Sequence, residues 1–535
     1  MLIIKWRNYM GNKLLKGTML LSAASLLSKI LGFIYIIPFT NLVGTSGYAL
    51  YKYAYGPYTI MISLSTMGIP LAISKMVSKY NQLGNEEIVQ KIFKYGIIAM
   101  MISGITAFTI LYNLAPALAS VVVDNSSDGN SFESVTYVIR MVSFALLIIP
   151  PMSFLRGFFQ GYQLMGPSAV STFVEQLARV FFILIGVFIA IKVLNSSVTK
   201  AVGVGTFGAF IGAVFGIGIL IFGIWRKKDY FFRPVNRESS YSEISIRSIY
   251  KEMITYSIPF VIMGLSLPIY QNIDTFTINK ILMDLGYSQV DAEIVNSVVG
   301  LAQILVLIPV SITTGLSVSL IPTITKSYIQ KDFTMLRNQM NQSFLLLTML
   351  IFPAALGIFI LADPLYLVLF GESNSPDLGG HLLKIYAPAA ILIAFYSVTS
   401  SILQAINQHK KLIQGLLIGI LIKLILNMIL PMFFHEEGFI IATYCGYSSS
   451  LLFNIFLINK KVGFNFNKAK FRLFTYLLSA MTMTIIVLLF ESMMDNYLNA
   501  YIIIIICSLL GIIIYGSCLY GLNYYRIKRF LHDTH

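Results

Sequence analysis

Five ionisable side chains lie deep inside long apolar stretches of this sequence, where a charge is costly. Lys29 lies in the run SLLSKILGFIYIIPFTNLVG, and Asp274 lies in FVIMGLSLPIYQNIDTFTINKIL. Glu175 and Arg179 share a third apolar run, and Lys423 lies in a fourth. Ionisable groups at the depth of a bilayer usually face a bundle interior or a water-filled cavity, and they mark substrate or ion pathways. These five residues are therefore the candidate substrate-binding residues.

Three of the candidates have charged or polar neighbours on the same predicted helix. Glu175 and Arg179 are four residues apart, so they share a helix face and can form an internal ion pair or contact a substrate together. Asp274 belongs to a polar stripe made of Gln271, Asn272, Thr275, Thr277 and Asn279. Such a stripe indicates either a water-filled cavity or hydrogen bonding between helices.

The remaining two candidates are cations. Lys29 has no acid within one helical turn, which favours a partner on another helix or an anionic ligand. Lys423, with Asn427 four residues later, permits the same interpretation. Three cations against two carboxylates leave the interior net positive, which favours an anionic substrate.

The sequence contains no motif that is typical of an enzyme active site. The sequence contains no Gly-rich phosphate loop, no His/Cys cluster with metal spacing and no Ser/His/Asp set. Its three cysteines, Cys445, Cys507 and Cys518, lie in apolar runs and form no disulfide framework. We therefore expect no enzyme, metal or cofactor, and a transport process without a nucleotide-binding domain.

The elements that must position these residues are membrane helices. Of 535 residues, 57% are hydrophobic and 11% are charged, and the mean hydropathy is +0.78. Soluble domains carry about 25% charged residues. The length criterion for spans predicts an all-α integral membrane protein with fourteen transmembrane helices. Their expected ranges are 17–43, 57–80, 92–116, 134–158, 166–193, 199–225, 252–283, 294–324, 340–363, 380–405, 411–432, 436–459, 470–491 and 498–522.

Loop charges set the expected orientation. The net charge is +15, and most of the 38 basic residues fall in alternate loops, including the linker 226–251. The positive-inside rule then places both termini in the cytoplasm of a multi-pass cell-membrane protein. Topology explains this charge better than nucleic-acid binding does, because the linker is too short for a binding fold.

The two halves of the chain look related. SKYNQ, after the second span, matches KSYIQ after the eighth, and Gln160 matches Gln404 at an offset of 244 residues. A repeat of six spans in one orientation is typical of transporters whose site lies between the halves. We expect an N-lobe over residues 1–225, a basic linker over 226–251, a C-lobe over 252–460 and two further helices over 461–535.

Several motifs carry a family resemblance: RGFFQGYQLMGP followed by EQLARV, MGIPLAISKMVSKYN, YQNIDTFTINKIL, SLIPTITKSY and ILQAINQHKK. They resemble the YtgP/SpoVB branch of the MOP superfamily of exporters, and in particular the MurJ-type lipid II flippases. The resemblance implies two six-helix lobes with pseudo-twofold symmetry about a central cationic cavity, and a groove for the lipid tail at helices 13 and 14. It also implies an undecaprenyl-pyrophosphate-linked glycan as substrate.

The chain departs from the pattern of the Gram-negative members. Those members have an arginine where Lys29 lies, and a second arginine where this chain has Tyr35. Arginines of their second helix have no counterpart in TIMISLSTMGIP, so the full arginine cluster of those members is not carried over to this chain.

The resulting hypothesis is alternating access, in which the lipid II headgroup enters the cavity and its tail stays among membrane lipids. Lys29, with Lys423 or Arg179, attracts the pyrophosphate, and Asp274 pairs with Lys29 when the cavity is empty. The driving force is left open between the membrane potential, worth about 2.3 kcal/mol per charge per 100 mV, and a coupling ion at Asp274 or Glu175. An exporter of another polyprenyl-linked polysaccharide is the alternative. A MATE-type drug/cation antiporter, a membrane glycosyltransferase or a scaffold fits the buried charges less well.

Overall fold

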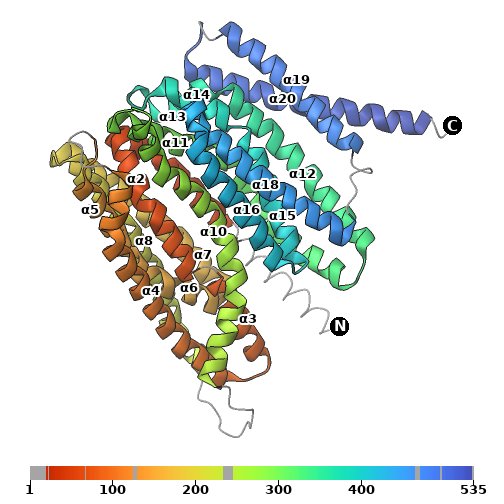
Figure 1. The fold of residues 1–535 in the computed structure, drawn as a ribbon. Helices are drawn as coiled ribbons and strands as arrows, with labels where there is room; N and C mark the ends of the chain where they lie inside the picture. Colours follow the sequence, from red (N-terminus) through yellow and green to blue (C-terminus); the bar gives the residue numbers. More distant parts are fainter. Residues whose placement is uncertain are drawn as a thin grey trace. The chain divides into compact units, whose positions relative to one another are not determined.

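The computed structural model describes residues 20–21, 23–66, 68–123, 129–232, 245–463, 470–494 and 497–532, and within these ranges the chain is helical with no strand (Figure 1). The N-terminal cations Lys5, Arg7, Lys13 and Lys16, and the centre of the predicted linker, lie outside the described residues. The described chain forms two compact units, Met1–Phe276 and Thr277–His535. The expected lobe boundaries stay a prediction.

The first unit is a helical bundle. Its helices are a segment over residues 23–34, α2 (Ile36–Thr66), α3 (Ile69–Gln82), α4 (Glu86–Val122), α5 (Phe132–Ser143), α6 (Ala145–Gly161), α7 (Met165–Phe188) with a π-helical turn at Ile189–Val193, α8 (Val198–Arg226), α9 (Lys228–Phe231) and most of α10 (Ile246–Asp284). The α7 and α8 pair is the most closely packed part of this bundle.

The second unit begins with the end of α10. Its other helices are α11 (Gln289–Ile329), α12 (Phe333–Ile360), α13 (Ala362–Phe370), α14 (Pro376–Tyr386), α15 (Ala389–Ala405), α16 (His409–Ile429), α17 (Pro431–Phe434), α18 (Glu437–Val462), α19 (Lys470–Met494) and α20 (Ala500–His532), with a short 3-10 turn at Glu372–Asn374. Here α16 packs on α18, and α19 packs on both α12 and α20.

Eleven helices, or twelve with one bent pair, are long and apolar enough to cross a membrane among the described residues. The segment Ala23–Gln82 counts as one of them, although Gly44 breaks it with a left-handed φ of 71°. The polar helix α10 is absent from that set, and α14 with α15 forms the bent pair. Dividing the first segment and adding α10 makes the architecture consistent with fourteen spans.

The turns between helices repeat along the chain at the offset seen in the sequence. Left-handed residues occur at Gln163 and Asn407, which are 244 residues apart, and at Gly84 and Lys331, which are 247 apart. The break between α5 and α6 falls at Phe144, and the break between α14 and α15 includes Pro388, again 244 residues later. The two units therefore share one pattern of helices and turns.

Close packing of α7 on α8 positions the first group of candidate residues. Gly208, Gly212 and Gly216 are spaced four apart on α8, so they form one stripe along the helix. A Cβ atom added at Gly212 would lie 2.7 Å from the backbone oxygen of Glu175 and 2.8 Å from Cβ of Arg179. Small residues spaced this way let two membrane helices approach closely. The stripe thus places α8 directly against the charged face of α7.

Candidate functional site

Glu175 is held between two arginines in the first unit. Its Oε1 accepts a hydrogen bond from Nη2 of Arg179 at 2.7 Å, and its Oε2 accepts one from Nη2 of Arg156 at 2.8 Å. The three side chains are only 12–17% exposed. The predicted pair on α7 is thus confirmed, and it is one half of a bridge that Arg156 extends to α6.

Arg156 also ties three helices together. It donates from Nε and Nη2 to Oγ of Ser171 on α7, and Ser171 donates in turn to the backbone oxygen of Gly216 on α8. Arg156 is not among the candidates predicted from the sequence, because it lies near the end of the fourth expected span, 134–158. The one sequence feature that pointed to Arg156 was its position in the motif RGFFQGYQLMGP. Helix periodicity shows which residues share a face of one helix, but it does not show which residues of two different helices meet.

Tyrosines of α2 surround the same group. Tyr51 stacks on Tyr55 with ring centroids 4.2 Å apart, and Tyr55 meets Tyr58 edge-to-face at 5.3 Å. The hydroxyls of Tyr35 and Tyr51 share a hydrogen bond. Within the described part of the chain, the hydroxyls of Tyr55 and Tyr58 are buried without a hydrogen-bond partner, as is Nε of Arg179. These groups form a polar interior around the Arg179 guanidinium.

Lys29 lies on the segment 23–34, which packs along α7. Ser28 donates from Oγ to the backbone oxygen of Thr172 at 3.3 Å, and Gly32 lies against Gln176, whose Nε2 would be 3.2 Å from an added Cβ. The Lys29 side chain itself is exposed. A lysine on the segment beside α7 therefore presents its charge outside the buried Glu175 bridge.

Asp274 is 2% exposed on α10, and its polar neighbours are also buried. Asn272 donates from Nδ2 to the backbone oxygen of Pro268, and Thr275 donates to the backbone oxygen of Gln271. In the second unit, Asn296 donates to Oδ1 of Asn279. Much of the stripe is thus used for hydrogen bonds within and between helices, which is the second of the two interpretations considered from the sequence.

A further cation, Lys52, lies on α2. Gly56 of α2 touches the side chains of Asn272 and Thr275, and Lys52 precedes Gly56 by one turn. α2 therefore contacts α10 at residues on either side of Asp274, one turn along α2 from Lys52. The predicted second span begins at residue 57, but the helix resumes directly after Gly44 and therefore includes Lys52. The tyrosine-rich start of this helix hid it from an apolar-run criterion.

Lys423 lies in the second unit and is fully buried at 0% exposure. Its Nζ donates to Oγ1 of Thr443 at 2.9 Å, which joins α16 to α18. One turn later, Asn427 donates from Nδ2 to Oγ1 of Thr277. An ammonium enclosed in this way crosslinks helices and has no accessible surface for a headgroup in this conformation.

The first unit thus brings together Arg156, Glu175 and Arg179, and it also contains the candidates Lys29, on the segment beside α7, and Asp274, on α10. This excess of positive charge suits a phosphate-bearing ligand better than a cationic drug. Among the described residues, no group of three or more His, Cys, Asp or Glu side chains could hold a metal ion.

Comparisons with known proteins agree with this architecture. The model of the family described as polysaccharide biosynthesis protein matches residues 14–328, and the MatE family model matches residues 259–429. A lipid II flippase of Bacillus subtilis, MurJ, is 38% identical over 524 residues, which cover 96% of each chain. Stage V sporulation protein B of the same organism is 24% identical over 74% of this chain and 73% of that protein.

Solved structures share the fold. A lipid II flippase MurJ in an inward closed conformation matches with a TM-score of 0.69 at 15% identity, covering 95% of this chain and 99% of that one. An inward-facing MATE-family multidrug transporter matches with a TM-score of 0.65 at 15% identity, covering 81% of this chain and 94% of that one.

Proposed function

Because the chain belongs to the polysaccharide biosynthesis protein family, and within it to the MurJ lipid II flippases, we propose that it moves lipid II from the inner to the outer leaflet of the cell membrane. The observation that carries this proposal is the 38% identity to MurJ of Bacillus subtilis over 96% of both chains. The protein is a multi-pass membrane transporter of the MOP superfamily and not an enzyme.

The charges of the first unit support a pyrophosphate-bearing substrate. Lys29 is exposed beside α7, whereas Glu175 is satisfied by Arg156 and Arg179. We assign the first contact with the pyrophosphate to Lys29 and Lys52. Lysine is a compact point charge and a common phosphate ligand. The Glu175 bridge and Lys423 then hold helices in place and do not contact the headgroup.

The alternating-access cycle requires contacts that differ between states, because a ligand shifts an equilibrium only through differential affinity. We propose that pyrophosphate competes with Asp274 for the cations of the first unit. The driving force is either the membrane potential or a coupling ion, with Asp274 as the carboxylate that would bind it. Both termini lie in the cytoplasm in this proposal, on the basis of loop charge.

Export of another polyprenyl-linked glycan is the second candidate. Stage V sporulation protein B supports it, but at 24% identity over 74% of the chain the support is weaker. The lipid tail in either case would follow α19 and α20, whose outer faces carry exposed residues such as Ile485 and Ile512.

Depletion of the protein in its host tests the proposal. We expect lipid II to be synthesised but to stay inaccessible to a membrane-impermeant probe of the outer leaflet. Normal exposure of lipid II in a strain without a second flippase would refute the proposal. Accumulation of a different lipid-linked glycan would support the second candidate instead.

A further inference from the structure

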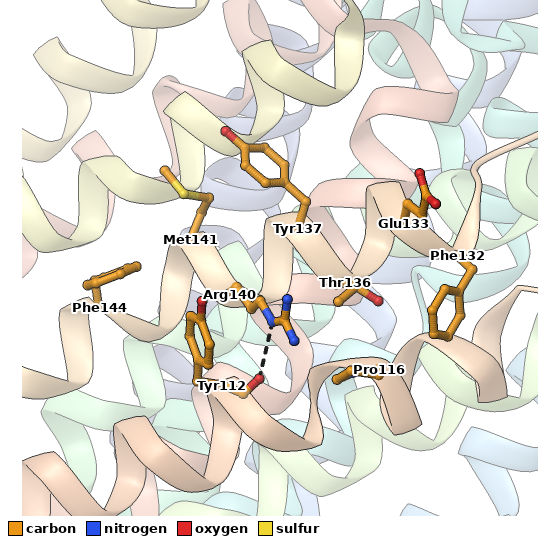
Figure 2. Close-up of a pocket in the computed structure, with 9 residues that line it drawn as sticks. All are labelled: Tyr112, Pro116, Phe132, Glu133, Thr136, Tyr137, Arg140, Met141 and Phe144. Carbon is orange, nitrogen blue, oxygen red and sulfur yellow. Dashed lines mark hydrogen bonds between the residues drawn. The ribbon is translucent and has the colours of Figure 1, made fainter.

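A cavity of about 580 Å³ opens between α4 and α5 of the first unit, away from the residues discussed above (Figure 2). Its lining residues are Tyr112, Pro116, Phe132, Glu133, Thr136, Tyr137, Arg140, Met141 and Phe144. One arginine and one carboxylate thus stand among six apolar or aromatic side chains, with a threonine hydroxyl between them.

The arginine is held in place by a proline-induced gap in α4. Pro116 has no N–H group, so the backbone oxygen of Tyr112 lacks the donor that a helix would normally supply. Nε of Arg140 donates to that oxygen at 3.5 Å, and the guanidinium lies over the Tyr112 ring at 4.8 Å from its centroid. Figure 2 shows this bond and the guanidinium beside Tyr112. The Nη groups have no carboxylate within 4.0 Å in the described part of the chain.

The cavity also contains a hydroxyl, that of Thr136, which has no hydrogen-bond partner among the described residues. Thr136 is 7% exposed, and its Oγ1 is buried without a hydrogen bond. Thr136 and Arg140 are four residues apart on α5, so both face α4 along one side of the helix. A buried hydroxyl normally finds a partner, because leaving it unsatisfied carries the full cost of its desolvation. The hydroxyl and the guanidinium therefore form a donor pair that an oxyanion would satisfy.

The surroundings of the cavity are suited to a membrane lipid. The lining residue Tyr137 is 38% exposed, so the cavity opens at the surface of the bundle. The opposite face of α4 carries Ile110 and Leu114, which are 43% and 48% exposed, as expected for side chains that face acyl chains. Arg140 lies about 12 Å along α5 from Phe132, at 1.5 Å per residue. Arginines at this depth extend to the headgroup level, and phosphate is the headgroup component that matches a guanidinium fork.

We propose that this cavity binds the phosphodiester headgroup of a membrane phospholipid. The phosphate accepts hydrogen bonds from Arg140 and Thr136, and the aromatic side chains enclose the glycerol backbone. Glu133, at the rim, disfavours a headgroup that carries a second negative charge.

Lipid binding to the full-length protein in detergent, followed by native mass spectrometry, tests this proposal. The probes are phosphatidylglycerol and a diacylglycerol with the same acyl chains but no phosphate. We expect the wild type to retain phosphatidylglycerol preferentially. Removing a hydrogen bond to a charged group should weaken this retention about tenfold in Arg140→Gln and about threefold in Thr136→Val.

Lys200 offers a matched control. It is an exposed cation at the start of α8, next to Thr199, whose hydroxyl bonds Ser134 of α5 at 3.0 Å. Lys200→Gln removes one positive charge from the same end of the bundle without touching the cavity, so lipid retention should not change.

Three results would overturn the proposal. Equal retention of both lipids by the wild type would show that phosphate is not recognised. A loss of phosphatidylglycerol retention in Lys200→Gln as large as that in Arg140→Gln would show a general charge effect. Full competition by free glycerol 3-phosphate would show a soluble-phosphate site. Should Arg140→Gln fail to fold, Thr136→Val and Arg140→Lys carry the test: undiminished retention in Thr136→Val would contradict the proposed donor pair.

Discussion

Replacing Glu175 by glutamine should destabilise the first unit strongly. The carboxylate accepts hydrogen bonds at 2.7 and 2.8 Å from two arginines on different helices, and all three side chains are at most 17% exposed. The oxygen of a glutamine can accept a hydrogen bond from one arginine. Its NH₂ group then faces the N–H groups of the other arginine, and two donors cannot form a hydrogen bond. Removal of one partner from a buried charge pair typically costs 3–5 kcal/mol. We expect the free energy of unfolding to fall by about 3 kcal/mol, because one of the two hydrogen bonds is retained.

Arg156→Gln is the matched comparison, because Glu175 then keeps its bond to Arg179. The Nε2 group of the glutamine takes the place of the arginine Nε and can still donate to Ser171, so the main loss is the bond to Glu175. One charge-assisted hydrogen bond is worth about 1.5–3 kcal/mol, so the loss in free energy of unfolding should be about half that of Glu175→Gln. Thermal unfolding of both variants in detergent, with lipid II transport measured in parallel, tests this order. A Glu175→Gln variant as stable as the wild type but without transport would refute the structural role and restore Glu175 as a substrate or ion contact.

Three further predictions concern helix contacts. Gly212→Ala places a Cβ atom 2.7 Å from a backbone oxygen of α7, so it should cost about 1–3 kcal/mol in thermal unfolding experiments; wild-type stability would contradict the close α7–α8 packing. Gly56→Ala should push α2 from the Asn272 side chain and lower transport at unchanged expression, with unaltered transport as the contrary result. The pair of Lys79 and Glu252 at 3.0 Å is 47% and 18% exposed, so a double-mutant cycle should give a coupling below about 1 kcal/mol, and a value above about 2 kcal/mol would contradict this.

Hydropathy and spacing predicted the helical architecture and the Glu175–Arg179 pair, because both depend on residues within one helix. The internal repeat was also visible in the sequence, and the left-handed turns at Gln163 and Asn407 occur at the same offset as Gln160 and Gln404. Each of these features depends on residues that are close in the sequence, so each could be predicted from the sequence alone.

Contacts between helices were not predictable in the same way. Arg156 lies nineteen residues before Glu175, and only the docking of α6 on α7 brings them together. The 0% exposure of Lys423 depends on α18, which supplies Thr443. Lys52 was missed because the polar, tyrosine-rich stretch before residue 57 does not form an apolar run, although it continues the helix.

Translocation of lipid II in reconstituted vesicles tests the central claim most directly. The measured quantity is the accessibility of the lipid II headgroup to a membrane-impermeant probe, for the wild type and for Lys29→Ala at matched protein content. The account predicts that the wild type equilibrates lipid II across the bilayer and that Lys29→Ala, although folded, does not. No translocation by the wild type, or equal translocation by Lys29→Ala, would contradict it.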